Sequence, residues 1–309
     1  MQRLKILKFG GTSVGRVDRL QSVVEIVGAA AREHRVIVVS SAASGVTDLL
    51  VDAADRLKNA PMGGLSVTSS LRVRHFELAA GLLPARILPL YVARMDLLLE
   101  ELDDLLHDAE GAPATPRLRD AVLAFGERLS MPLVQLGLEA AGVPSVCADA
   151  SRLVRTDDRH GAARVVRSAT NRRVRDWYAG LVPGTVPVVT GFLGATSAGA
   201  VTTLGRGGSD YTAALLAAAL RAFVFERWTD VDGIYTDDPR IHPDAKRLHT
   251  LALDEAWVWN RAGRIGMHRR ALDPLVDAGI RIHVRSTGAP DHPGTVILPR
   301  TPLARAAAG

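Results

Sequence analysis

The sequence predicts an α/β fold with a mainly parallel central sheet that helices cover on both faces. Three observations indicate this fold: strand-like and helix-like stretches alternate, the second strand-like stretch is almost entirely apolar, and polar or glycine residues follow the strands. Alternation favours βαβ units, and an apolar strand is typical of a parallel sheet buried on both sides. The residues that follow the strands would then gather at one edge of the sheet, where open α/β sheets bind ligands.

The predicted elements follow in chain order. A first strand ends at Gly10 and Gly11, and a helix with apolar residues at helical spacing precedes the apolar second strand. A long helix follows Pro89, and a proline-containing stretch breaks it. The predicted strands cover residues 4–9, 35–40, 144–149, 186–190 and 222–228, and the predicted helices include residues 17–32, 90–107 and the buried, apolar 211–220.

Composition excludes several classes of protein. The 309 residues are 47% hydrophobic, which is enough for a sizeable core. The 38 basic and 33 acidic residues give a net charge of +5, but the basic residues are scattered and aromatics are only 5%, which argues against a nucleic-acid-binding surface. The single cysteine, Cys147, excludes a disulfide framework and a multi-cysteine zinc site, and we expect it in the core.

The N-terminus carries lysines where a signal peptide needs an unbroken apolar stretch. The longest smooth apolar run, residues 211–220, is far shorter than the ~20 residues of a membrane helix. We therefore expect a cytoplasmic protein that has no membrane partner.

The most informative stretch is residues 202–214, TTLGRGGSDYTAA, where a glycine-rich loop leads into an apolar helix. Glycines let the backbone approach a ligand, and the first turn of a helix directs free N–H groups at negative charge. Arg206 adds a fork that suits carboxylate or phosphate. The stretch predicts an anion site, although a glycine-rich turn with Ser209 or Asp210 as an ordinary N-cap would explain the glycines alone.

This stretch resembles the signature TTLGRGGSDYTA of the aspartate kinases, which are members of the amino acid kinase superfamily. Residues 8–14 resemble the family's KFGGTSV, 126–130 its GERLS, 190–194 its TGFxG and 228–240 its WTDVDGIYTxDPR, in the family's order. The resemblance implies a three-layer αβα sandwich of the carbamate kinase-like fold. It also implies a catalytic domain over residues 1–300, with a substrate lobe over about 1–200 and a nucleotide lobe over about 201–300, before a tail at 301–309.

The activity that the resemblance implies is transfer of the γ-phosphoryl group of ATP to the side-chain carboxylate of L-aspartate, with Mg²⁺, giving 4-phospho-L-aspartate and ADP. This is a first step towards amino acids made from aspartate semialdehyde, or towards a specialised product. A carboxylate is already ionised at neutral pH, so it needs no general base. It needs cations and N–H groups that neutralise the charge on the transferred group.

The resemblance assigns roles to seven residues. Lys8 matches the lysine that stabilises the transferred phosphoryl group. Asp210 matches the aspartate that orients this lysine and nearby groups. Glu127 matches the glutamate that pairs with the substrate's α-ammonium, although next to Arg128 it could lie on a solvated helix face. The remaining acceptor residues are Arg206 and Ser209, for the α-carboxylate, and Ser41 and Thr47, which line the same pocket.

The nucleotide should be held by another device, because the sequence has neither a Walker loop nor a dinucleotide-type G-x-G-x-x-G after a strand. The resemblance assigns no protein ligand for a metal. From the residues alone, the stretch 237–239 is simply a turn. The positions that match the family's nucleotide site are Gly10, Gly11, Thr229, Asp230, Tyr235, Arg240 and Arg264.

Two features depart from the family. The nucleotide-contacting lysine of the family's FGAKVLHPRT falls on Ile265 in an ungapped comparison, and Arg264 is a candidate to replace its charge. The chain also ends soon after the block at 293–297, where aspartate kinases usually continue into two ACT domains that bind inhibitors and build the dimer. If the 309 residues are the whole protein, we expect no ACT domain and no inhibition by lysine or threonine through the usual site; the alternative is that this sequence is a truncated part of a longer chain.

Two alternatives stay open. One is a kinase of the same fold that acts on another small amino acid or carboxylate, because nothing in the sequence sizes the side-chain pocket. The other is a non-catalytic aspartate or nucleotide sensor, which Ile265 would favour. The predicted partners are L-aspartate and ATP, and a homodimer is possible.

Overall fold

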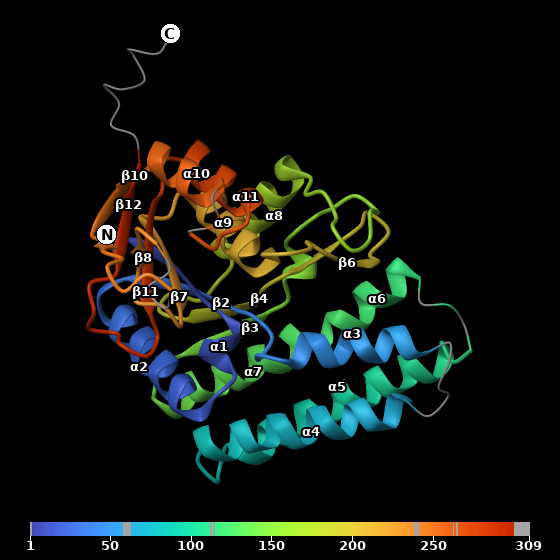
Figure 1. Cartoon of the computed structure of the whole chain (residues 1–309). Coiled ribbons are helices and arrows are strands. Elements are labelled where there is room, and N and C mark those ends of the chain that lie inside the picture. Colours follow the sequence, from blue (N-terminus) through green and yellow to red (C-terminus); the bar gives the residue numbers. More distant parts are fainter. Residues whose placement is uncertain are drawn as a thin grey trace.

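The computed structural model describes residues 2–57, 63–111, 113, 115–237, 241–261, 263 and 265–299. Its centre is an eight-stranded sheet in the order β10-β12-β11-β7-β1-β2-β4-β3 (Figure 1). Every neighbouring pair is parallel except β11 and β12. The strands are β1 (Leu4–Phe9), β2 (Arg35–Ser40), β3 (Ser145–Ala148), β4 (Val186–Thr190), β7 (Val224–Thr229), β10 (Thr250–Ala252), β11 (Arg281–Ser286) and β12 (Thr295–Leu298), while β5 (Leu193–Ala195) pairs with β6 (Val201–Thr203) and β8 (Ile234–Tyr235) with β9 (Arg247–Leu248).

Helices pack on both faces of this sheet (Figure 1). The first core lies under α1 (Gly11–Val14), α2 (Val17–Glu33), α3 (Val46–Arg56), α4 (Gly63–Leu82), α5 (Leu88–Asp108), α6 (Pro116–Leu123) and α7 (Phe125–Ala140). The second lies under α8 (Arg167–Ala179), α9 (Gly208–Leu220), α10 (Leu253–Arg261) and α11 (Arg269–Asp277), and a short 3₁₀ turn covers Ala150–Arg152.

Alternation along β1 decides which face each side chain reaches. Leu7 and Phe9 belong to the first core, whereas Ile6 belongs to the second. Successive side chains of a strand point to opposite faces, so Lys8 points to the same face as Ile6, towards α9. The sheet thus directs one charged side chain of a buried strand at the start of one helix.

The predicted αβα fold is confirmed. The strands predicted at 4–9 and 35–40 have those bounds, and the other predicted elements are present within a few residues of their predicted ends. The prediction that Cys147 lies in the core is wrong, because β3 is an edge strand and leaves the side chain half-buried. The predicted tail at 301–309 lies outside the described residues.

The predicted boundary between two lobes near residue 200 stays a prediction. Strands from both sides of that boundary belong to one continuous sheet, joined where β1 pairs with β7. Within the described ranges, no helix has the length and apolar character needed to cross a membrane.

Candidate active site

A buried ion pair joins the end of β1 to the first turn of α9. Lys8 Nζ lies 2.8 Å from Asp210 Oδ1, and the two side chains are only 10% and 6% exposed. Burial alone would raise the pKa of Asp210, but the positive charges of Lys8 and Arg227 hold it below its ordinary value. Asp210 is therefore a carboxylate that fixes the position of two cations.

The loop before α9 owes its shape to glycine. Gly205 and Gly207 have φ values of 74° and 72°, a left-handed conformation that other residues rarely adopt. Arg206 lies between them and is exposed, and its guanidinium has no hydrogen-bond or ion-pair partner within the described residues. The loop presents this free guanidinium beside the helix N-terminus, where both features favour an anion.

Glu127 is buried on α7 and 5% exposed, so the solvated-helix interpretation is wrong. Its Oε1 lies 3.4 Å from Ser209 Oγ, and the backbone N–H of Ala42 also donates to its carboxylate. Burial raises the pKa of Glu127 to about 8, although these hydrogen bonds and the charge of Lys8 oppose the rise. Within the described part of the chain this carboxyl group forms no ion pair, and an ammonium ligand would supply a cation for one.

The helix α7 also orders the loop after β2. Ser130, one turn beyond Glu127, donates to the carbonyl of Ser41 at 2.6 Å. A Cβ at Gly126 would lie 2.8 Å from Ala42 Cβ, so a glycine is required where α7 meets this loop. The GERLS block therefore places Glu127 and fixes the backbone next to Ser41.

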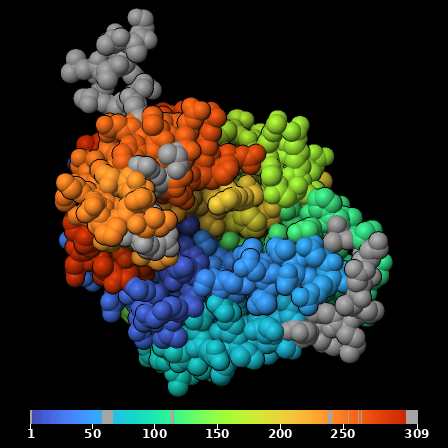
Figure 2. Space-filling model, viewed as in Figure 1, coloured from blue at the N-terminus to red at the C-terminus, as the bar shows by residue number. Residues whose placement is uncertain are grey.

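These elements enclose one cleft of about 750 Å³. In Figure 2 the surface is hollowed between the blue N-terminal segments and the yellow and orange ones. The cleft is lined by all seven residues predicted to carry the transfer or hold the acceptor, namely Lys8, Ser41, Thr47, Glu127, Arg206, Ser209 and Asp210.

Sequence reasoning missed Asp120, a fully buried carboxylate in the wall of this cleft. It accepts hydrogen bonds from Thr203 Oγ1 at 2.5 Å and from the backbone N–H of Gly161 at 3.0 Å, and His160 Nδ1 lies 2.8 Å from it. Asp120 thereby ties α6 to β6 and to the loop around residue 161. No local pattern marks this aspartate, because its partners lie far away in the sequence.

Phe192 is a second lining residue that was not predicted, and its φ of 67° is unusual for a residue with a side chain. It follows Gly191, where a Cβ would lie 2.5 Å from Ser209 Oγ. The TGF block therefore lets the end of β4 pass close to the start of α9. The glycine of the block was the available signal.

Of the residues predicted to bind nucleotide, some line this cleft and others lie outside it. Gly11 lines the cleft, and Gly10 donates its N–H to Trp228 O at 3.3 Å, which brings it beside Thr229 at the end of β7. Thr229 Oγ1 donates to Asp230 Oδ1 at 2.9 Å. Gly10, Thr229 and Asp230 do not line the acceptor cleft.

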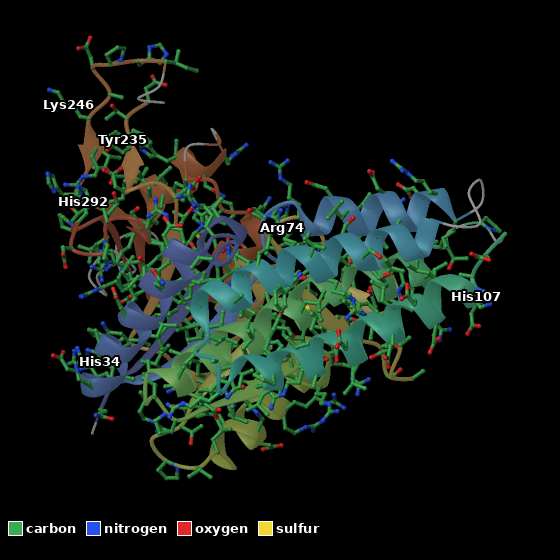
Figure 3. The ribbon with its side chains drawn as sticks, turned by 90° about the horizontal axis from the view of Figure 1, so that it is seen from below. His34, Arg74, His107, Tyr235, Lys246 and His292 are labelled. Atoms are coloured by element: carbon green, nitrogen blue, oxygen red, sulfur yellow. The ribbon has the colours of Figure 1, made fainter. Side chains whose placement is uncertain are left out.

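Tyr235 lies on the two-stranded β8–β9 ribbon and also lies outside that cleft. Its hydroxyl donates to Asp232 Oδ1 at 2.9 Å. Figure 3 shows Tyr235 and Lys246 at the opposite end of the molecule from His107. The predicted contacts of Arg240 and Arg264 lie outside the described residues.

Ile265, which the ungapped comparison aligns with the family's nucleotide-contacting lysine, is part of the core. Ile265 is 3% exposed and packs in the second hydrophobic cluster. Its side chain therefore brings no charge to the site, whereas its carbonyl accepts a hydrogen bond from Arg227 Nη1 at 3.3 Å. Arg227, which was not predicted as a site residue, also lies 3.3 Å from Asp210 through its Nε.

Residues 3–286 match the sequence model of the amino acid kinase family. The chain belongs to this family. It is 35% identical to lysine-sensitive aspartokinase 3 of Escherichia coli over an alignment of 312 residues, which covers the whole chain and 68% of that relative. This match confirms the predicted membership among the aspartate kinases.

Solved structures agree. The crystal structure of E. coli aspartokinase III in complex with aspartate and ADP superposes with a TM-score of 0.88 at 34% identity, over 96% of this chain and 65% of that one. Carbamate kinase from Giardia lamblia bound to AMP-PNP has a TM-score of 0.59 at 10% identity, over 97% and 99% of the two chains. The second likeness concerns the fold alone, and it confirms the predicted carbamate kinase-like fold.

Proposed function

We propose that this chain phosphorylates the side-chain carboxylate of L-aspartate with ATP, giving 4-phospho-L-aspartate and ADP. The observation that carries the proposal is a cleft in which a buried lysine–aspartate pair adjoins a buried carboxylate and an exposed guanidinium. A related structure with the same fold was solved with aspartate and ADP bound.

The cleft has the charges that an α-amino acid requires. An α-ammonium group would form an ion pair with Glu127, which favours the ionised form of this carboxyl group despite burial. The α-carboxylate suits Arg206, Ser209 and the first turn of α9. With both α-groups held, the side-chain carboxylate of a short amino acid is left to approach Lys8.

The transfer then needs no proton removal. A carboxylate oxygen of aspartate forms a bond to the γ-phosphorus, and the bond from that phosphorus to the bridging oxygen breaks as ADP leaves. Lys8 neutralises charge on the transferred group, and Asp210 holds the Lys8 ammonium in place. Ser41 and Thr47 are proposed to line the acceptor pocket.

Mg²⁺ fits this site as a companion of the nucleotide. Among the described residues there is no group of three His, Cys, Asp or Glu side chains that could hold a metal ion. Mg²⁺ commonly keeps few protein ligands and takes phosphate oxygens instead, whose charge it neutralises. We propose Gly10, Gly11, Thr229, Asp230, Tyr235, Arg240 and Arg264 as nucleotide-side residues, and we keep the homodimer as a further proposal.

The test is trapping of the acyl phosphate. Purified protein, Mg-ATP and L-aspartate are incubated with hydroxylamine, and L-glutamate, D-aspartate and succinate serve as matched acceptors. Aspartyl hydroxamate with an equal amount of ADP is expected. Hydroxamate from another acceptor alone would change the substrate and keep the chemistry, whereas binding of ligands with no hydroxamate from any acceptor would favour a sensor.

A further inference from the structure

Two cations share one carboxylate at the end of the sheet. Lys8 and Arg227 are register partners on β1 and β7, so their side chains reach the same face. Lys8 Nζ lies 2.8 Å from Asp210 Oδ1, and Arg227 Nε lies 3.3 Å from Oδ2 of the same carboxylate. Each carboxylate oxygen thus has its own cation, and the three side chains together carry one surplus positive charge.

The guanidinium of Arg227 is only partly used by the protein. Besides Asp210, it donates from Nη1 to Ile265 O at 3.3 Å and from Nη2 to Gly266 O at 3.1 Å. Guanidinium has five N–H donors, so two of them remain without a partner in the described part of the chain. The side chain is 15% exposed, which leaves these donors within reach of a ligand.

The direction from which a nucleotide arrives follows from the acceptor cleft. The attacking and leaving oxygens lie roughly in line across the transferred phosphoryl group. With the acceptor held by the residues that line the cleft, this in-line arrangement places the leaving ADP on the far side of the transferred group from the acceptor. Arg227 does not line the acceptor cleft, and it adjoins the Ile265–Gly266 backbone.

We propose that Arg227 contacts the phosphates of the bound nucleotide and supplies the positive charge that the buried Ile265 cannot supply. The inference rests on the proposed function, since it assumes that ATP is the phosphoryl donor. A guanidinium fork suits the oxygens of a phosphate, and the surplus charge beside Asp210 suits an anion. The hydrogen bonds to the carbonyls of Ile265 and Gly266 then orient the guanidinium.

The test compares binding of Mg-ATP, Mg-ADP and adenosine, without an acceptor, by isothermal titration calorimetry. The Arg227→Met variant loses a hydrogen-bonded charge, so it should bind Mg-ATP about 10- to 100-fold more weakly than wild type. Adenosine has no phosphate, so its affinity should stay within about twofold of wild type. Arg227→Lys keeps a charge and should recover part of the loss, and it remains informative if the methionine variant does not fold.

Two arginines provide matched comparisons. Arg175 donates from Nε to Ala219 O at 2.9 Å, a tether like that of Arg227 but between α8 and α9, and Arg175→Met should leave Mg-ATP affinity unchanged. Arg264→Met tests the other candidate cation. Wild-type Mg-ATP affinity in Arg227→Met would overturn the inference, as would an equal loss for Mg-ATP and adenosine, because a mere tether would affect both.

The inference and the proposed function can fail separately. If wild type forms aspartyl hydroxamate and Arg227→Met binds Mg-ATP normally, the function stands and the inference is overturned. If wild type forms no hydroxamate but loses Mg-ATP affinity selectively in Arg227→Met, the phosphate contact stands and the proposed function fails.

Discussion

The two sides of the Lys8–Asp210 pair are built differently. On the acceptor side, backbone devices such as the glycine loop before α9 and the close passage at Gly191 bring every predicted residue into one cleft. On the proposed nucleotide side, Ile265 stands where the ungapped comparison with the family expects a lysine, and Arg227 contacts Asp210 from the neighbouring strand. A site that depends on backbone conformation is visible in the sequence as short motifs. A single charge can instead come from a residue on another strand, which no such motif marks.

The largest effect should come from Lys8, which belongs to both sides. Lys8→Met removes the charge nearest the transferred group and should lower kcat by about 10³-fold. Hydroxamate formation at saturating substrates measures kcat, and calorimetry should show that L-aspartate still binds. Equal kcat in variant and wild type would remove Lys8 from the mechanism.

Lys5 provides the matched control for that experiment. It lies on the same strand but points to the opposite face, where its Nζ is 3.1 Å from Glu226 Oε1. Lys5→Met breaks an ion pair to β7, at 3.1 Å against 2.8 Å for the Lys8 pair, and should cost stability without changing kcat. A large loss of kcat in Lys5→Met would mean that damage to the sheet, rather than loss of the Lys8 charge, explains the first result.

A smaller effect is expected from pH, which should change the KM for L-aspartate but not the KM for ATP. Burial raises the pKa of Glu127 to about 8, so at pH 7 the free protein holds it mostly protonated. An ammonium ligand requires the carboxylate, hence the KM for L-aspartate should fall by up to about tenfold per pH unit from about pH 6 to 8, with release of a proton on binding at pH 7. The KM for ATP should not follow this trend.

Variants decide whether Glu127 is the group that titrates. Glu127→Gln should raise the KM for L-aspartate by about 10- to 100-fold and remove its pH dependence. Glu101→Gln is the control. The exposed carboxylate of Glu101 lies 2.6 Å from the guanidinium of Arg128, the residue next to Glu127 on α7. A pH dependence that survives in Glu127→Gln would contradict the assignment.

The fold was predictable because its inner strands admit one interpretation. Residues 35–40 are almost entirely apolar, which suits the interior of a parallel sheet, and the structure has strands with the predicted bounds at 35–40 and at 4–9. Strand order is not recorded in such patterns. The half-buried Cys147 shows this, since its strand looks like the others in sequence and lies at the edge of the sheet.

The candidate site was predictable where residues act within one motif. Ser209 and Asp210 follow their glycine loop directly, and Glu127 belongs to one helical turn with Ser130. Asp120 and Arg227 were not predictable, because each depends on what lies opposite it. Asp120 meets Thr203 from another element, and Arg227 becomes a site residue only through its register with Lys8.

The smallest predicted effect tests whether the backbone builds the acceptor side. In Gly191→Ala, the added Cβ would lie 2.5 Å from Ser209 Oγ and 2.9 Å from its Cα, so the start of α9, which carries Ser209, must shift away from residue 191. We expect kcat/KM for L-aspartate to fall by about tenfold and the KM for ATP to change less. Gly28→Ala is the control, since its Cβ would meet Val143 at an ordinary 3.6 Å and, within a helix, should raise stability by up to about 1 kcal/mol. An unchanged KM for L-aspartate in Gly191→Ala would mean that side chains alone, on both sides of the pair, define this site.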